Sequence, residues 1–158
     1  MGLNAFVFCD CYEKGRLKRP PPNPEFVYVL PHGDIDCRSD DPKVLKRFDR
    51  WRPNACRHRE GVLAGDSFGS ITGIDLLRNM LTPQRRILPT LLNHVIWSGS
   101  HTGDHLTVKQ VQKLSVELDR LKEFRCGAKV IDLEIQAFRR RLARLVRVAL
   151  KAGRPIAF

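Results

Sequence analysis

The last third of the chain carries apolar residues every three or four positions and therefore predicts two consecutive helices. The first helix is expected to begin at a capping box formed by Thr107 and Gln110. The second is expected over about residues 128–152 and to stop at Gly153, the residue type favoured just past a helix end. The apolar positions are Val111, Leu114, Leu118 and Leu121 in the first helix, and Ile131, Ile135, Phe138, Leu142, Leu145 and Ala149 in the second.

The first half of the chain predicts short strands separated by loops. Residues 4–9 and residues 26–30 are apolar runs of strand length, and the tail 155–158 could add to the same sheet. Residues 13–24 hold four cations and then four prolines, which predicts an exposed loop. Residues 60–69 are rich in glycine and are also expected to be a loop.

Two more helices are predicted between these regions. Asp41 suits a helix cap with Pro42 at the first helical position, and the helix should end near residue 52. Ser70 can cap a helix through Leu81. The apolar stretch 91–97 fits a helix or a strand, since its periodicity does not decide between them.

Strands followed mostly by helices indicate an α+β fold, with the C-terminal helices forming an antiparallel hairpin. The length of 158 residues suits one domain, 1–158, that includes the proline-rich loop at about 13–24. No apolar run approaches the roughly 20 residues that span a bilayer. With no export signal at the start and five cysteines, an odd number, the expected location is the cytoplasm and no membrane partner is expected.

The charge is strongly positive and uneven. Of the net charge of +11, residues 107–158 supply +8, from 13 basic and 5 acidic side chains. Arg140, Arg144 and Arg147 lie on one face of the last predicted helix, opposite its apolar face, and are called here the arginine row. The row predicts contact with an acidic protein partner or, weakly and non-specifically, with nucleic acid. A solvated helix face is the alternative interpretation.

The polar loop after residue 96 is a second candidate binding element. It contains Trp97, a residue type favoured at protein contacts, followed by His101, Asp104 and His105. These side chains are also capable of acid–base chemistry, and a purely structural loop is a further alternative.

The cysteines offer a metal hypothesis that the spacing does not favour. The candidate ligands are Cys9, Cys11, Cys37, Cys56 and His58, but no Cys-x-x-Cys pair is present. We expect no cofactor and no stoichiometric zinc, with Cys9 and Cys126 as small buried thiols. A nucleophilic Cys11 or Cys56 acting with His94 is another alternative.

Several segments along the chain together resemble a family of small bacterial proteins similar to toxin-immunity proteins. The resemblance implies a protein that binds a cognate antibacterial toxin, such as a secreted toxin domain, and blocks its active site. It implies no catalytic residues. The segments are Met1-Gly-Leu-Asn-Ala5, Cys9-Asp-Cys11, Cys37-Arg-Ser-Asp-Asp41, Phe48-Asp-Arg-Trp51, Ser98-Gly-Ser-His-Thr-Gly-Asp104 and Pro155-Ile-Ala-Phe158.

Three hypotheses about function follow. The first is a non-enzymatic module that binds an acidic protein partner, with immunity against a toxin as its specific form. The second is a basic nucleic-acid-binding protein. The third is a hydrolase that depends on its Cys and His residues or on a metal.

Overall fold

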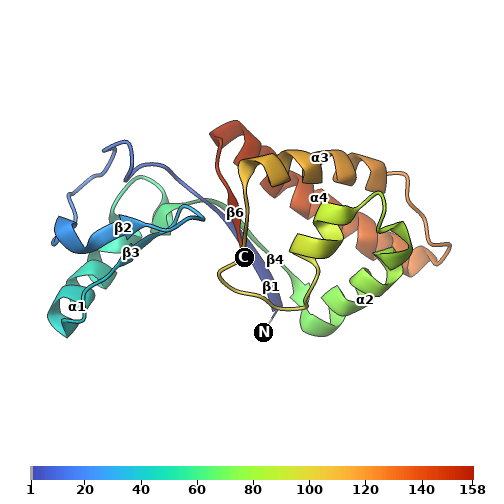
Figure 1. Cartoon of the computed structure of the whole chain (residues 1–158), viewed down its shortest axis with the longest axis horizontal. Coiled ribbons are helices and arrows are strands. Elements are labelled where there is room, and N and C mark those ends of the chain that lie inside the picture. Colours follow the sequence, from blue (N-terminus) through green and yellow to red (C-terminus); the bar gives the residue numbers. More distant parts are fainter. Residues whose placement is uncertain (1) are drawn as a thin grey trace.

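Two long strands form the centre of the molecule in a computed structural model, which describes residues 2–158 (Figure 1). Strand β1 (Gly2–Phe8) pairs antiparallel with β4 (Val62–Ser70). In β1, Leu3, Ala5 and Val7 are fully buried while Phe6 is exposed. This alternation shows that helices cover one face of the sheet and leave the other open.

The chain's C-terminal tail completes the sheet. Strand β6 (Ile156–Ala157) pairs with β1 on one side and with β5 (His105–Leu106) on the other, giving the order β4-β1-β6-β5. The expectation that this tail adds to the sheet is therefore confirmed. Because β6 lies inside the sheet, its backbone groups are paired on both edges, and Ile156 is fully buried.

The expectation of a loop over residues 60–69 is wrong, because most of this segment is β4. Glycine weakens the interior of a strand but often marks a bulge or a close approach of another group. At Gly65 a Cβ atom would lie 2.8 Å from the Phe6 ring, so the missing side chain makes room for that ring. Gly69 has a φ of 140° and lies opposite Leu3, where the register shifts in a bulge.

The three long helices are close to those expected from the sequence. They are α2 (Ile71–Leu81), capped by the Ser70 side chain, α3 (Val108–Leu121) and α4 (Lys129–Ala152). The capping box at Thr107 is present in full, and Gly153 ends α4 with a φ of 64°. Helices α3 and α4 pack along each other as the predicted hairpin (Figure 1), and the fold class is α+β.

Between β1 and β4 the chain forms a smaller unit, residues 9–61, called here the N-terminal lobe, while the rest is the main lobe (Figure 1). The core of this lobe is built on the buried side chains of Val27, Cys37 and Phe48. Asp41 caps its helix with Pro42 at the first position, as expected. The elements are η1 (Pro24–Phe26), β2 (Val27–Val29), β3 (Ile35–Cys37), α1 (Pro42–Trp51), η2 (Arg52–Asn54) and η3 (Arg59–Gly61).

The segment that periodicity left undecided is helical. After η4 (Thr82–Gln84), residues Leu91–Val95 form a short π-helix, η5. Its start is held by Glu117, whose carboxylate is buried and accepts hydrogen bonds from the backbone N–H groups of Thr90 and Leu91, each at 2.8 Å. Among the described residues, no helix is both long and apolar enough to cross a membrane.

We predict that Glu117→Gln destabilises the protein by about 1–3 kcal/mol, because the amide leaves one of these two buried N–H groups without an acceptor. Urea unfolding of both proteins measures the difference. The exposed Glu123→Gln is the matched control and should change the free energy of unfolding by less than about 0.5 kcal/mol. Equal stability of Glu117→Gln and the wild type would contradict the prediction.

Candidate functional site

The pairing of β1 with β4 brings three cysteines and a histidine together at the base of the N-terminal lobe. Cys9 and Cys11 follow β1, whereas Cys56 and His58 lie just before η3 and β4. The backbone N–H of Cys9 donates to the Gly61 carbonyl at 2.7 Å and so continues the strand pairing by one step. The chain segment that enters the lobe and the segment that leaves it therefore lie next to each other at these residues.

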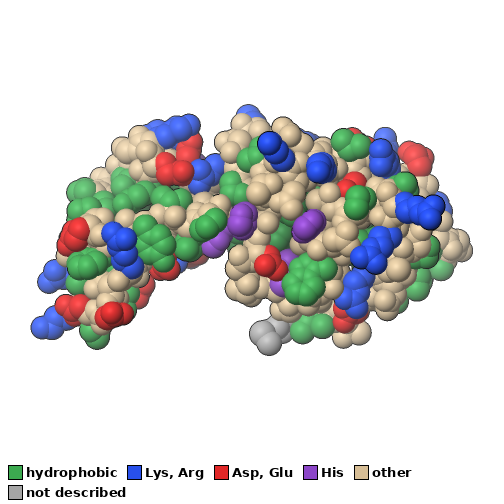
Figure 2. Space-filling model, viewed as in Figure 1, with side chains coloured by type: hydrophobic (Ala, Val, Ile, Leu, Met, Phe, Trp, Pro, Cys, Tyr) green, Lys and Arg blue, Asp and Glu red, His purple; other side chains and the backbone are tan. Residues whose placement is uncertain are grey.

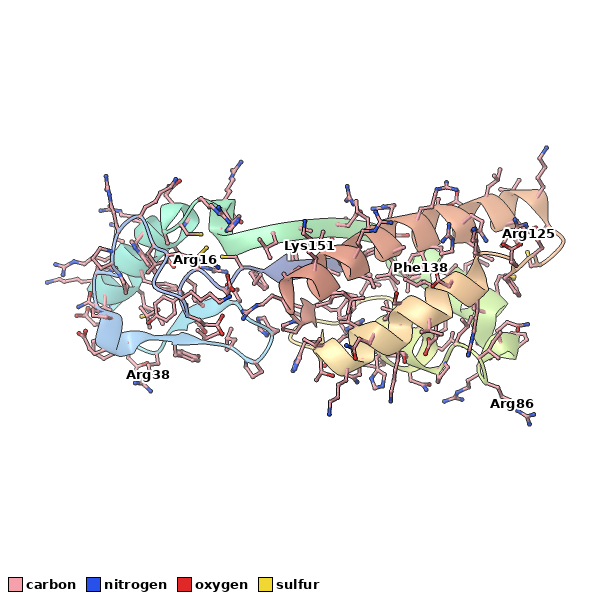
Figure 3. The ribbon with its side chains drawn as sticks, turned by 90° about the horizontal axis from the view of Figure 1, so that it is seen from above. Arg16, Arg38, Arg86, Arg125, Phe138 and Lys151 are labelled. Carbon is pink, nitrogen blue, oxygen red and sulfur yellow. The ribbon has the colours of Figure 1, made fainter. Side chains whose placement is uncertain are left out.

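The four potential ligand atoms converge closely. The Sγ atoms of Cys9 and Cys56 are 3.7 Å apart, and His58 Nδ1 lies 3.4 Å from Cys11 Sγ and 3.8 Å from Cys56 Sγ. All four ligand atoms lie within 4.8 Å of one another. These four residues are called here the Cys/His cluster. Sulfur atoms can be seen gathered beside Arg16 at this end of the sheet (Figure 3).

The sequence analysis named all four residues, with Cys37, as candidate ligands but favoured no metal, because no Cys-x-x-Cys pair is present. Strand β1 ends at Phe8, and the chain turns after it. The turn is closed by the backbone hydrogen bond from Arg16 N–H to the Cys11 carbonyl, at 2.7 Å. Two other candidates lie elsewhere, because Cys37 packs in the lobe's apolar core and His94 is exposed on η5.

The cluster is poorly accessible to solvent. Burial raises the pKa of Cys9 to about 12, and burial, together with the charges of Arg57 and Arg16, lowers the pKa of His58. The hollow beside the cluster holds only about 20 Å³. The donor set can ligate a soft metal ion, but a hollow of this size admits no substrate beyond about one water molecule.

Arg154, just after α4, fixes the position of the lobe next to the cluster. Its guanidinium forms an ion pair with Glu13 at 2.6 Å and donates hydrogen bonds to the backbone carbonyls of Phe8 and Gly33, each at 3.3 Å. The His32 and His105 rings also meet across the boundary, with centroids 6.4 Å apart. Figure 2 shows histidine side chains between the lobes. The C-terminal segment thus holds both lobes in one arrangement.

The arginine row is on the outer face of α4, as expected, but its members differ. Arg140 and Arg147 are exposed and form no ion pair within residues 2–158. Arg144 instead pairs with Asp66 of β4 at 2.8 Å, and Arg141 binds the same carboxylate. Part of the positive charge on this helix is therefore used to hold α4 against the sheet.

The loop after residue 96 also divides into exposed and buried members. Trp97 is 46% exposed, and the Arg78 guanidinium donates to its carbonyl at 2.6 Å. The His101 side chain is only 3% exposed, donates from Nε2 to the Val95 carbonyl at 2.9 Å and faces Asp104 at 3.2 Å. His101 is placed to stabilise the loop rather than to contact a partner.

The two predicted surfaces do not form one site. Arg144 reaches Asp66 on β4, which is one edge of the sheet, whereas His105 lies on β5, the opposite edge. Residues of the arginine row and of the 97–105 loop therefore face different sides of the molecule. The fold therefore does not combine the arginine row and the 97–105 loop into one partner-binding surface.

Sequence reasoning missed a basic concavity on the N-terminal lobe. It lies between the proline-rich loop and α1, has a volume of about 630 Å³ and is called here the basic hollow. The signal in the sequence was a pair of cations before the prolines and another pair on the helix, but their proximity depends on the fold. Its lining residues are Lys18, Arg19, Pro20, Pro22, Arg47, Arg50, Trp51 and Asn54.

Comparisons of this chain with protein-family models, with curated proteins and with solved structures found no match.

We predict that Asp66 stabilises the fold in a pH-dependent way. Burial alone would raise its pKa, but the hydrogen bond from Arg141 and the charges of Arg141 and Arg144 lower it below the usual 3.8. A lowered carboxyl pKa contributes stability above the unfolded-state pKa, and this contribution is lost as the pH falls through the folded-state value. The stability advantage of the wild type over Asp66→Asn should therefore be full near pH 6 and shrink below about pH 4.

Thermal or urea unfolding across this pH range checks the prediction. Asp119 is exposed and forms no ion pair among residues 2–158, so Asp119→Asn is the control and should change stability little at any pH. A wild-type advantage over Asp66→Asn that stays constant from pH 6 to about pH 3 would contradict the role given to Asp66.

Proposed function

We propose that this protein is a non-enzymatic binding module and that the basic hollow receives an acidic segment of a protein partner. The observation that carries the proposal is the lining of the hollow, which includes four cations and no carboxylate. Electrostatic complementarity of this kind speeds association and selects acidic partners.

The four cations of the hollow are available to a partner. Lys18, Arg19, Arg47 and Arg50 are all exposed, and none forms an ion pair within the described residues. Arg and Trp are the side chains most enriched at energetic hot spots of protein interfaces, and Trp51 supplies an aromatic wall between the two cation pairs. Charge and contact area are thus present in one concavity.

The hollow is also held in a defined shape. The indole N–H of Trp51 donates to the Arg19 carbonyl at 3.0 Å, which ties the proline-rich loop to the end of α1. Prolines in the adjoining loop restrict its backbone, and Trp51 packs against Phe48 of the lobe core with ring centroids 5.9 Å apart. A site that needs little ordering on binding loses less conformational entropy when it is filled.

The size of the hollow favours a short acidic peptide segment over a nucleic-acid duplex. A duplex-binding protein commonly neutralises about 6–10 phosphates along a continuous track. The hollow offers four cations, and the arginine row lies apart from it on α4 in the main lobe. Nucleic-acid binding is therefore the alternative outcome of the test rather than the proposed function.

We predict that the double variant Arg47→Glu/Arg50→Glu weakens binding of a glutamate-rich peptide by about tenfold or more, a change of about 1.4 kcal/mol. Both residues are exposed on α1, so the folded structure should survive the change. Fluorescence anisotropy with a labelled peptide at two salt concentrations gives the affinity, and the wild type should bind more weakly at high salt.

The matched control is Arg140→Glu/Arg147→Glu, which makes the same charge change on α4 and should leave peptide affinity nearly unchanged. If this variant loses binding while the α1 variant keeps it, the arginine row is the interface and the proposal is wrong. A labelled single-stranded oligonucleotide of equal charge is the second probe. Much tighter binding of the oligonucleotide than of the peptide would replace the proposal with nucleic-acid recognition.

In its specific form, the proposal makes this protein an immunity protein whose partner is an antibacterial toxin domain. The support is the resemblance of its sequence segments to proteins similar to toxin-immunity proteins, combined with a basic surface that suits an acidic toxin surface. Binding would act by covering the toxin's active site. The basic hollow, rather than the arginine row, is then the part of this protein that contacts the toxin.

We predict that co-production of this protein protects bacteria from a toxin domain encoded beside its gene, and that Arg47→Glu/Arg50→Glu removes the protection. Colony counts with and without toxin induction measure it. The Arg140→Glu/Arg147→Glu variant should protect as well as the wild type. Equal killing with and without the wild-type protein would reject the immunity form. The general proposal, binding of an acidic segment, would still be decided by the peptide-binding experiment.

A further inference from the structure

We propose that Cys9, Cys11, Cys56 and His58 bind one Zn²⁺ ion and that this ion closes the base of the N-terminal lobe. The inference is independent of the proposed partner and reverses the expectation of no zinc drawn from the sequence. It depends on the convergence of four ligand atoms, all within 4.8 Å of one another, from two segments that are distant in the chain.

Three of the six distances between the ligand atoms are close to those of a tetrahedral zinc site. With Zn–S near 2.3 Å and Zn–N near 2.0–2.1 Å, a regular tetrahedron places sulfur atoms about 3.8 Å apart and sulfur and nitrogen about 3.6 Å apart. The Cys9–Cys56 sulfur separation is 3.7 Å. His58 Nδ1 lies 3.4 Å and 3.8 Å from the sulfurs of Cys11 and Cys56.

The donor set favours zinc in a structural role. Three thiolates and one imidazole in tetrahedral arrangement form a common structural zinc site, in which protein atoms take all four positions. A catalytic zinc ion needs a position left for water or substrate. Here four ligands are present and the adjoining hollow holds only about 20 Å³.

A bound ion would add stability to the N-terminal lobe. It is an insertion between two strands, and its small apolar core is built on the buried residues Val27, Cys37 and Phe48, with partly buried side chains packed around them. Units of this size bury little apolar surface, and a disulfide, a metal or a partner often adds to their stability. Cys9 and Cys56 are 47 residues apart and stand at the two ends of the insertion, so one ion joins entry to exit.

The surroundings suit the bound ion. Three thiolates and Zn²⁺ carry a net charge of −1, and the charges near His58 are those of Arg57 and of the ion pair between Arg16 and Asp10, which together are net positive. The backbone N–H of His58 points at Cys56 Sγ at 3.4 Å, a contact that stabilises a thiolate ligand. Arg57 Nε lies 3.3 Å from His58 Nε2 and, being exposed, is free to turn away when metal at Nδ1 leaves the proton on Nε2.

Two other interpretations explain less of this geometry. A Cys9–Cys56 disulfide would require the sulfurs to move from 3.7 Å to about 2.05 Å and would leave Cys11 and His58 without a role. A Cys11–His58 catalytic pair would need room for a substrate, which a hollow of about 20 Å³ does not give. Zinc accounts for all four residues at once.

The test begins with the full chain purified in a thiol reductant without added metal. We expect about one zinc per chain by elemental analysis, since the protein supplies a complete ligand set. After the zinc is removed, added Co²⁺ should produce the strong visible absorption of a tetrahedral thiolate site, and added Zn²⁺ should abolish it. Cys56→Ser should lose stoichiometric zinc, whereas Cys37→Ser, a buried thiol outside the cluster, should keep it.

A rescue variant keeps the test informative if Cys56→Ser does not fold. His58→Cys creates a four-thiolate set and should retain zinc, whereas His58→Ala should lose it. Removing zinc from the wild type should make the chain between the ligand pairs, residues 12–55, sensitive to protease. The strands and helices of the main lobe should remain protected.

Three results would overturn the proposal. The wild type could contain no zinc and fail to take up either metal under reducing conditions. Its intact mass could be lower by two hydrogens, with two fewer free thiols, which would show the disulfide. Cys37→Ser could lose zinc as completely as Cys56→Ser, which would show that the ligands have been assigned wrongly.

Discussion

The antiparallel pairing of β1 with β4 is the constraint on which the rest of the molecule depends. It aligns Phe6 with Gly65 and runs until the Cys9 N–H meets the Gly61 carbonyl at 2.7 Å. The apolar face of β1 supports the helices of the main lobe, while the far ends of the two strands form the stem of the N-terminal lobe. Any residue placed just beyond these ends is forced close to its counterpart, which is how the Cys/His cluster arises.

Both proposed sites belong to the N-terminal lobe, and Arg154 ties that lobe to the main lobe. Arg154 belongs to the C-terminal segment, yet its guanidinium contacts Glu13, Phe8 and Gly33 beside the cluster. Metal binding at the stem and an acidic segment in the basic hollow would therefore act on a lobe that the main lobe already orients. A zinc ion at the stem would restrict the same insertion that carries Arg47, Arg50 and Trp51, and would help to keep the hollow in shape.

Much of the fold could be predicted because its signals are local. Capping at Asp41, Ser70 and Thr107 and the stop at Gly153 need only neighbouring residues, and the structure confirms each of them. Strand β4 could not be predicted, because its glycine-rich sequence becomes a strand only through pairing with a distant partner. The role of Glu117 was equally hidden, since its buried carboxylate binds backbone groups of η5, far away in the sequence.

The α+β class, the helical hairpin, the excess of positive charge and the identity of the cysteines and histidines follow from the amino-acid sequence alone. Spacing and composition are read within a few residues, and these properties need nothing more. Only the tertiary structure decided which residues meet. Cys37 lies apart from the other candidate ligands, and the histidine beside Cys11 and Cys56 is His58 and not His94. Arg144 forms an ion pair with Asp66, and the His101 side chain is buried. Such contacts join segments far apart in the chain, and their geometry depends on the strand register and on the turns that local patterns leave open.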